Sequence, residues 1–324
     1  MNKVLEVKDL KTYFFTRRGV VKAVDGVSFD LGEGETLGLV GESGCGKSVS
    51  CFSVIGLVDK PAGHIVGGQV IFEGEDLLLK SEGEMSHIRG KRISMILQDP
   101  MMSLNPLYTI GDQVSEPIRI HQKADKRTAW DKAKEMLKAV KIPSPEVRMK
   151  EFPHQMSGGM RQRISEAMVL SCEPRLLLAD EPTTSLDVTI QAGFLRLLKE
   201  LQQQSGFSMI VVTHDFGIVA RVCDRVAVMY AGKIVETATT RDLFNNPTHP
   251  YTVALMKSLP RMDIKVDKLY SIEGQPPELH IPIIGCAFKD RCASVMEICK
   301  QEYPPQTTIS DGHYMNCWLA KKSN

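Results

Sequence analysis

Residues 41–48, GESGCGKS, fit the pattern G-x-x-x-x-G-K-[ST], whose glycines let backbone N–H groups turn toward phosphate oxygens. An apolar stretch that predicts a strand ends at Gly41, and a helix is expected from Lys47 onward. The helix N-terminus favours an anion, Lys47 would neutralise the β- and γ-phosphates, and the Ser48 hydroxyl would bind Mg²⁺. The predicted ATP-binding residues of this loop are Gly41, Glu42, Ser43, Gly44, Cys45, Gly46, Lys47 and Ser48.

An acidic pair, Asp180 and Glu181, stands at the end of a second apolar stretch, RLLLAD, which is typical of a buried parallel strand. Ligands bind at the carboxyl ends of strands in an open parallel sheet. Asp180 would therefore reach Mg²⁺, mostly through water, and Glu181 would polarise an attacking water. Alone, the pair could equally cap the next element. The phosphate loop upstream favours the catalytic interpretation.

Two more polar side chains come directly after apolar stretches. Gln98 follows ISMIL and would contact both metal and water, while His214 follows MIVVT and would contact the γ-phosphate and Glu181. Either residue alone would carry little information, and a single histidine is more often structural. Their shared position at one sheet edge predicts Glu181, His214 and Gln98 as catalytic residues, and Ser48, Gln98 and Asp180 as Mg²⁺ ligands.

The segment MSGGM, residues 156–160, places a serine and two glycines at the start of a predicted helix. This arrangement makes a second anion site possible, although serine is also a common helix N-cap with no further function. The interpretation of this segment therefore depends on the other motifs.

The composition of the chain limits its class. Of 324 residues, 43% are hydrophobic and 24% charged, and the net charge is +1, which argues against a strongly basic nucleic-acid surface. No apolar run approaches the ~18–20 residues that cross a bilayer, and the N-terminus lacks the apolar stretch of a secretory signal. We expect a cytosolic protein whose eight cysteines are reduced, bound to metal or buried.

The chain alternates between strand and helix patterns. Strands are expected at LEVKDLKTYFF, RISMILQDP, RLLLAD and SMIVVTH, and helices at TAWDKAKEMLKAV and TIQAGFLRLLKELQQQ. This βαβ order predicts an α/β fold with a mostly parallel sheet and a helical insertion. The composition changes near residues 245–265, where we place a domain boundary.

In their order along residues 4–245, these motifs resemble the ATP-binding cassette (ABC) family. The resemblance implies a P-loop NTPase cassette with a mixed sheet core, an antiparallel β part and a helical subdomain. It places an ATPase domain at residues 1–250, with its helical subdomain at about 99–172, and a small cysteine-containing domain at 251–324. It also implies that Tyr13 or Phe14 stacks on adenine, and spacing alone does not choose between them.

The same resemblance assigns the second anion site to a partner. Two cassettes of this family pack head to tail, so that the signature motif of one closes over ATP on the phosphate loop of the other. The signature residues would be Ser157, Gly158, Gly159 and Met160, and the D-loop would be Ser185, Leu186 and Asp187, with Asp187 also contacting this ATP. Met160 replaces the usual glutamine, but the serine hydroxyl and glycine N–H donors remain.

Three stretches, LQDPMMSLNPLYTIGDQV, NNPTHPYTVALMKSLPR and EGQPPELHIPIIGCAFKDRC, resemble the D-type ATPase subunits of bacterial dipeptide and oligopeptide importers. The resemblance implies an ATPase motor, peripheral on the cytoplasmic side of the inner membrane, that drives uptake through two permease subunits. The second ATPase would be an F-type paralogue or another copy, and a peptide-binding protein would take part indirectly. Alternatives are an importer of nickel or another small solute, or an ABC ATPase acting on nucleic acid or in translation.

Four cysteines gather near the C-terminus at the spacing C-x5-C-x6-C-x17-C. They could be unrelated small apolar residues, but such a concentration in a reducing compartment favours bound metal. The absence of tight C-x2–4-C pairs disfavours zinc, although Zn²⁺ stays the alternative, and the family resemblance implies a 4Fe-4S cluster. The predicted ligands are Cys286, Cys292, Cys299 and Cys317.

Overall fold

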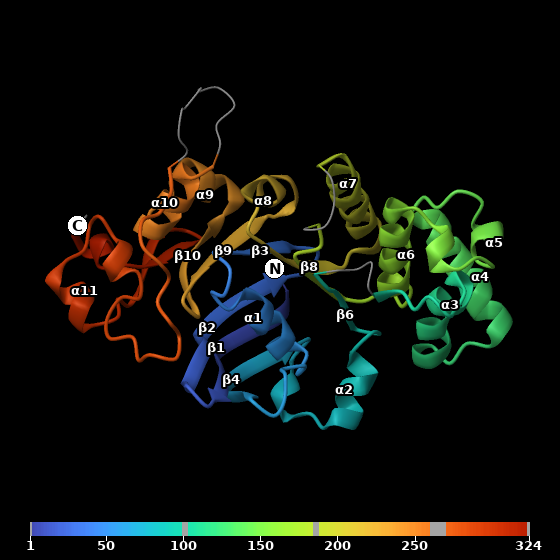
Figure 1. The fold of residues 1–324 in the computed structure, drawn as a ribbon, viewed down its shortest axis with the longest axis horizontal. Helices are drawn as coiled ribbons and strands as arrows, with labels where there is room; N and C mark the ends of the chain where they lie inside the picture. Colours follow the sequence, from blue (N-terminus) through green and yellow to red (C-terminus); the bar gives the residue numbers. More distant parts are fainter. Residues whose placement is uncertain (1, 99–102, 184–187, 260–269, 323–324) are drawn as a thin grey trace. The chain divides into compact units, whose positions relative to one another are not determined.

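The chain divides into two units, each assembled from separate stretches of sequence. The computed structural model describes residues 2–98, 103–183, 188–259 and 270–322. The first unit comprises Met1–Val4, Leu31–Thr36 and Asp76–Val212, and the second comprises Leu5–Asp30, Leu37–Glu75 and Thr213–Asn324. Figure 1 shows the elements of both units, coloured along the sequence.

The first unit contains three parallel strands in the order β8-β7-β6. Every residue of β7 and β8 is buried, as predicted for a parallel sheet that is covered on both faces. Because the strands are parallel, their carboxyl ends meet at one edge. Their bounds are β6 (Ile93–Ile96), β7 (Leu176–Asp180) and β8 (Ser208–Thr213).

The first unit also contains six α-helices among its described residues, of which α3, α4 and α6 pack against one another in the green part of Figure 1. In α3, Ile110, Val114 and Ile118 recur every fourth residue and are fully buried, so they form its packed face. Asp125 caps α4 by accepting bonds from two backbone N–H groups. The helices are α2 (Glu82–Ile88), α3 (Ile110–His121), α4 (Lys126–Ala139), α5 (Pro145–Arg148), α6 (Gly158–Leu170) and α7 (Val188–Ser205).

The second unit contains two groups of strands. One is a sheet in the order β2-β1-β4-β5, in which β1 and β4 are antiparallel. The other follows the order β11-β12-β10-β9-β3, parallel between β3 and β9 and antiparallel elsewhere. Their bounds are β1 (Lys3–Thr16), β2 (Gly19–Gly32), β3 (Thr36–Val40), β4 (Gly63–Phe72), β5 (Glu75–Asp76), β9 (Arg225–Tyr230), β10 (Lys233–Thr239), β11 (Gln306–Ser310) and β12 (His313–Asn316).

The C-terminal segment joins the second unit through β12 and a buried carboxylate. Glu236 of β10 accepts bonds from the backbone N–H of Thr248 at 2.8 Å and of His249 at 3.0 Å, and it contacts His313 of β12 at 2.8 Å. A buried charge with this many partners fixes the elements that supply them. The helices of this unit are α1 (Lys47–Val54), α8 (Phe216–Val222), α9 (Thr240–Asn245), α10 (Pro250–Lys257) and α11 (Glu297–Gln301).

Among the described residues, no helix combines the length and the apolar composition that crossing a membrane requires. The described part of residues 99–172, predicted as a helical subdomain, contains α3 to α6. The boundary predicted near residues 245–265 stays a prediction.

A buried carboxyl group in α6 lacks a hydrogen-bond partner among the described residues. Glu166 is 1% exposed, and neither of its side-chain oxygens is bonded. It lines a cavity of about 340 Å³ between α6 and α7, together with Gln162, Ile190 and Phe194. Burial raises the pKa of Glu166 well above its ordinary value of 4.5, and the Arg163 guanidinium opposes the shift.

This carboxyl group makes stability depend on pH in a direction that can be tested. Glu166 ionises near pH 4.5 in the unfolded chain but stays neutral to higher pH when folded, so its contribution is lost as pH rises. Relative to the wild type, Glu166→Gln should gain free energy of unfolding from pH 5 to pH 8, by up to about 1.4 kcal/mol per pH unit. Urea unfolding at both pH values measures this.

The exposed Glu116 of α3 offers a matched control, because Glu116→Gln removes a carboxylate that water solvates. Its effect should be the same at pH 5 and pH 8. An equally constant effect of Glu166→Gln would show that Glu166 ionises normally in the folded chain.

Candidate active site

The phosphate loop lies between β3 and α1, as predicted, and its lysine points back into the loop. Lys47 is 5% exposed, and its ammonium group donates to the carbonyl oxygens of Gly41 at 2.8 Å and Glu42 at 3.0 Å. A buried ammonium must be paired, and here backbone oxygens solvate it. The lysine is therefore held inside the loop, where an incoming phosphate would replace carbonyl groups as its partner.

Three glycines of the loop have positive φ angles, for two different reasons. A Cβ atom on Gly41 would lie 2.2 Å from the Met229 carbonyl oxygen, and one on Gly46 would lie 2.2 Å from that of Ala23. Gly44, with φ +78°, has no atom within 4 Å of such a Cβ. Packing thus excludes side chains at both ends of the loop, whereas its exposed tip, Ser43 and Gly44, faces open space.

Cys45 belongs to the loop, and its side chain is buried. Burial raises the pKa of its thiol, and the nearby Lys47 charge opposes the rise. The sulfur lies 3.8 Å from Lys47 Nζ. The thiol therefore stays protonated and acts as a small packing group. Ser48 follows Lys47 in the first turn of α1.

Tyr13 and Phe14, the two candidates for stacking on adenine, lie on opposite faces of β1. Tyr13 donates to Asp25 at 2.6 Å, and the Lys22 ammonium lies 5.5 Å from its ring centroid. Burial, followed by the bond to Asp25, raises the pKa of Tyr13 to about 12.

Phe14 shares its strand face with Thr12, because side chains alternate along a strand. The hydroxyl of Thr12 bonds that of Ser53 in α1 at 2.7 Å. Phe14 therefore faces the side of the sheet that packs on the helix following the phosphate loop. Its ring packs on Gly63, where a Cβ atom would lie 2.8 Å from Phe14 Cε1.

In the first unit, the structure brings Gln98 and Glu181 together. Gln98 follows β6 and Glu181 follows β7, and Gln98 Nε2 donates to Glu181 Oε2 at 3.2 Å. The backbone N–H of Glu181 donates to the Val212 carbonyl of β8 at 2.9 Å, and its φ angle is +43°. A left-handed backbone at a residue with a side chain costs about 1–2 kcal/mol. Such strain, held by surrounding contacts, is typical of functional sites.

Asp180 and His214 lie at the carboxyl ends of two paired strands, β7 and β8. Asp180 is the last residue of β7 and is only 4% exposed. His214 follows Thr213, the last residue of β8, and its side chain is exposed. The positions at strand ends agree with the sequence prediction, and the chemical roles of both residues stay predictions.

The predicted signature residues open α6. Ser157 is the exposed N-cap, and its hydroxyl accepts a bond from the Met160 backbone N–H at 3.3 Å. A Cβ atom on Gly159 would meet only Ile190, at an ordinary 3.7 Å. Packing of the described residues therefore does not require glycine there. Ser185, Leu186 and Asp187 lie outside the described residues.

The four C-terminal cysteines influence one another without forming a metal site. All four are free thiols. Burial, together with the negative charges that Cys299, Cys317 and Cys292 would carry as thiolates, raises the pKa of Cys286 to about 11, and a backbone hydrogen bond from Phe288 opposes the rise. Within the described ranges, however, no group of three or more His, Cys, Asp or Glu side chains is arranged to hold a metal ion. The structure therefore does not support the predicted cluster, or a zinc site, in the conformation observed.

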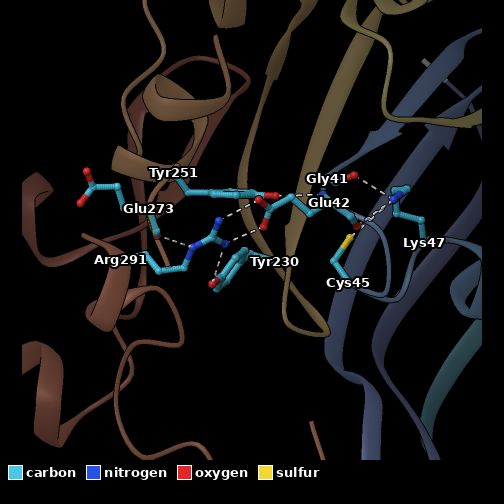
Figure 2. Close-up of polar contacts among 8 residues, drawn as sticks. All are labelled: Gly41, Glu42, Cys45, Lys47, Tyr230, Tyr251, Glu273 and Arg291. Atoms are coloured by element: carbon cyan, nitrogen blue, oxygen red, sulfur yellow. Dashed lines mark hydrogen bonds and ion pairs between the residues drawn. The ribbon is translucent and has the colours of Figure 1, made fainter. Parts of the chain in front are cut away.

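Sequence analysis missed two residues that contact the phosphate loop. Figure 2 shows the guanidinium of Arg291 paired with the carboxylate of Glu42, and the hydroxyl of Tyr251 at the backbone of Glu42. Both residues lie within stretches that carried the family resemblance, but no local pattern marked them. Their partner is more than 200 positions away in the sequence.

Comparisons with known proteins found relatives that match nearly the whole chain. A family model described as "ABC transporter" matches residues 24–184, and one described as "Oligopeptide/dipeptide transporter, C-terminal region" matches residues 235–299. The dipeptide transport ATP-binding protein DppD of Bacillus subtilis is 52% identical over 319 residues, which cover 98% of this chain and 95% of that protein. The oligopeptide transport ATP-binding protein OppD of Haemophilus influenzae is 48% identical over 326 residues, which cover all of both chains.

Solved structures match a smaller part of the chain. The dimeric, post-hydrolysis structure of the ATP-binding cassette MJ0796 with ADP and phosphate has a TM-score of 0.65 at 25% identity, covering 73% of this chain and 99% of that one. The structure of cbiO1 from Clostridium perfringens, part of the cbiONQ transporter complex, has the same TM-score and identity and covers 76% of this chain and 92% of that one.

Proposed function

Because this chain belongs to the ATP-binding proteins of dipeptide and oligopeptide ABC transporters, we propose that it is the ATP-hydrolysing motor of a peptide importer. Its fold is that of an ATP-binding cassette. The observation that carries the proposal is identity near 50% over almost the whole length of relatives with these names, including the C-terminal region specific to such transporters.

The residues present suit a bound Mg²⁺–ATP. Mg²⁺ is usually held by one or two carboxylates together with phosphate oxygens, so the single buried carboxylate of Asp180 with Ser48 and Gln98 is a chemically suitable donor set. When bound, Mg²⁺ neutralises charge that develops on the phosphates. Lys47 and the loop N–H groups would orient the β- and γ-phosphates, and His214 would contact the γ-phosphate.

Glu181 is proposed to orient and polarise the attacking water. Its backbone is fixed by the bond to Val212, and its carboxylate is held by Gln98 at 3.2 Å, so little reorganisation is needed when the water binds. Gln98 would then contact water as well as metal. For adenine, the proposal selects Phe14, because Tyr13 is already bonded to Asp25 and lies on the other face of β1.

The signature residues Ser157, Gly158, Gly159 and Met160, with Asp187, are proposed to bind the nucleotide of a second ATPase. Support comes from the exposed N-cap of α6, from Gly159, where a Cβ atom would meet only Ile190 in ordinary contact, and from the dimeric nucleotide-bound state of MJ0796. The second ATPase would be an F-type paralogue or another copy of this chain. ATP would bridge the two, and hydrolysis would remove the bridge.

Closure and opening of this dimer are proposed to drive two membrane permease subunits, with the ATPase peripheral on the cytoplasmic side of the inner membrane. A separate binding protein would supply the peptide. Nickel or another small solute is the alternative cargo. Isolation of the chain from native membranes, followed by identification of its partners, tests this assembly. Absence of permease subunits would contradict it.

The four C-terminal cysteines are proposed to hold a 4Fe-4S cluster, with Zn²⁺ as the alternative. Support comes from four cysteines in a short segment, whose thiolate forms would repel one another unless a cation bound them. Binding would require the sulfur atoms to move from their present arrangement. Its contribution would be structural, as a staple for a segment with little core.

Metal analysis of the anaerobically purified chain tests the cluster. We expect about four irons per chain with broad visible absorbance, which Cys292→Ser should lower and Cys172→Ala should leave unchanged. A colourless protein that contains one zinc per chain would contradict the iron–sulfur cluster and support the zinc alternative. A chain with neither metal would contradict both.

Glu181→Gln tests the proposed base. The amide keeps the shape of the side chain but cannot accept a proton, so ATP hydrolysis should fall at least about 100-fold. ATP affinity should change little, because the phosphate loop is untouched. Steady-state phosphate release and nucleotide binding measure the two quantities. Unchanged turnover would exclude Glu181 as the base.

Gly159→Asp tests action in trans. The structure accommodates a Cβ atom at this position, whereas a carboxylate there would repel phosphate on a partner. We expect ATPase activity to fall by about 100-fold or more while the isolated chain still binds ATP. Gly83→Asp, at a helical position where a Cβ atom would meet nothing within 4 Å, is the control and should retain activity. Loss of ATP binding by the Gly159→Asp monomer would contradict the assignment.

A further inference from the structure

Glu42, the second residue of the phosphate loop, has every polar group engaged. Its backbone N–H donates to the Tyr251 hydroxyl at 2.9 Å, and its carbonyl accepts from Lys47 Nζ at 3.0 Å. Its carboxylate accepts two bonds from Arg291, at 2.6 Å and 2.9 Å, which run parallel in Figure 2. The outer side of the loop is thus tied to the C-terminal part of the chain.

Arg291 is itself held on all sides. Its side chain is 5% exposed, Nη1 also donates to the Tyr230 hydroxyl at 3.2 Å, and Nε donates to the Glu273 carbonyl at 3.1 Å. The guanidinium lies 5.8 Å from the Tyr230 ring centroid and 6.0 Å from that of Phe288. A bidentate arginine–carboxylate pair with a buried guanidinium is a rigid contact. Lysine cannot reproduce its geometry.

The second contact, from Tyr251, is equally well supported. His249 caps α10 by accepting the Tyr251 backbone N–H on Nδ1 at 3.0 Å, and Glu236 binds the His249 backbone. The ring centroids of Tyr251 and Tyr230 lie 4.6 Å apart, and the ring centroid of Phe288 lies 5.3 Å from each of them. Residues from β9, α10 and the segment that carries the cysteines therefore form one packed cluster against Glu42.

Charge gives this contact a consequence for nucleotide binding. A free carboxylate in a loop that receives a polyphosphate would repel the ligand, and Arg291 cancels that charge while fixing the loop. We propose that Arg291 is a positioning residue for ATP, through which the C-terminal segment around residues 286–292 sets the nucleotide affinity of the phosphate loop. The inference rests on the proposed function, because it takes ATP as the ligand.

Binding of mant-ATP, a fluorescent ATP analogue, to the purified full-length chain tests the inference. Arg291→Ala should raise the Kd by roughly tenfold or more, since it leaves a carboxylate unpaired beside the phosphate site. Arg291→Lys should lie between this variant and the wild type. Adding Glu42→Gln to Arg291→Ala should restore the affinity to within about threefold of Glu42→Gln alone, because no unpaired charge remains.

Arg225 provides the matched control, because it pairs with Asp30 at 3.4 Å in the same unit, and neither residue is in the loop. Arg225→Ala should leave the Kd unchanged. The inference would be overturned if Arg291→Ala bound mant-ATP with the wild-type Kd, or if adding Glu42→Gln did not restore the Kd of Arg291→Ala. Either result would leave the proposed function intact. If Arg291→Ala acted only by disturbing the structure, it would lower thermal stability, and adding Glu42→Gln would not restore the Kd. That result would also overturn the inference. Absence of mant-ATP binding by the wild type would overturn both.

Discussion

A positive charge held inside the backbone of the phosphate loop is the interaction on which the rest depends. Lys47 is almost fully buried, and carbonyl groups of its own loop solvate its ammonium group. That arrangement requires the tight turn made by glycines at both ends, whose side-chain positions are filled by neighbouring backbone. The loop therefore holds its backbone and its lysine in one fixed arrangement, which suits the proposed phosphate site.

The roles proposed for the other groups depend on that site. Gln98 and Glu181 stand at the ends of parallel strands and are bonded to each other, which suits the orientation of a water that is proposed for them. Ser157 caps a different helix, and a Cβ atom on its Gly159 would meet only Ile190, which suits the proposed ligand carried by a partner. The pair formed by Glu42 and Arg291 adds a link from the C-terminal segment to the loop.

Local features of the fold could be predicted from the sequence, and long-range pairings could not. The strand, loop and helix around residues 41–48 follow from apolar pattern and glycine spacing, and the meeting of Gln98 and Glu181 follows from the geometry of parallel strands. The bond between Glu42 and Arg291 joins residues 249 positions apart, and no local signal marks it. No local signal predicts the pairing of β12 with β10 either. The same holds for the burial of Glu166 without a hydrogen-bond partner among the described residues.

The central claim is that each ATP is bound by the phosphate loop of one chain and the signature residues of another. Complementation between two inactive variants tests it most directly. Lys47→Ala lacks a working loop and Gly159→Asp lacks a working signature, so each alone should not hydrolyse ATP. A dimer containing one of each has one intact composite site, and mixing them should restore phosphate release well above the sum of the two. A mixture that stays inactive, although the two chains associate, would contradict a shared site.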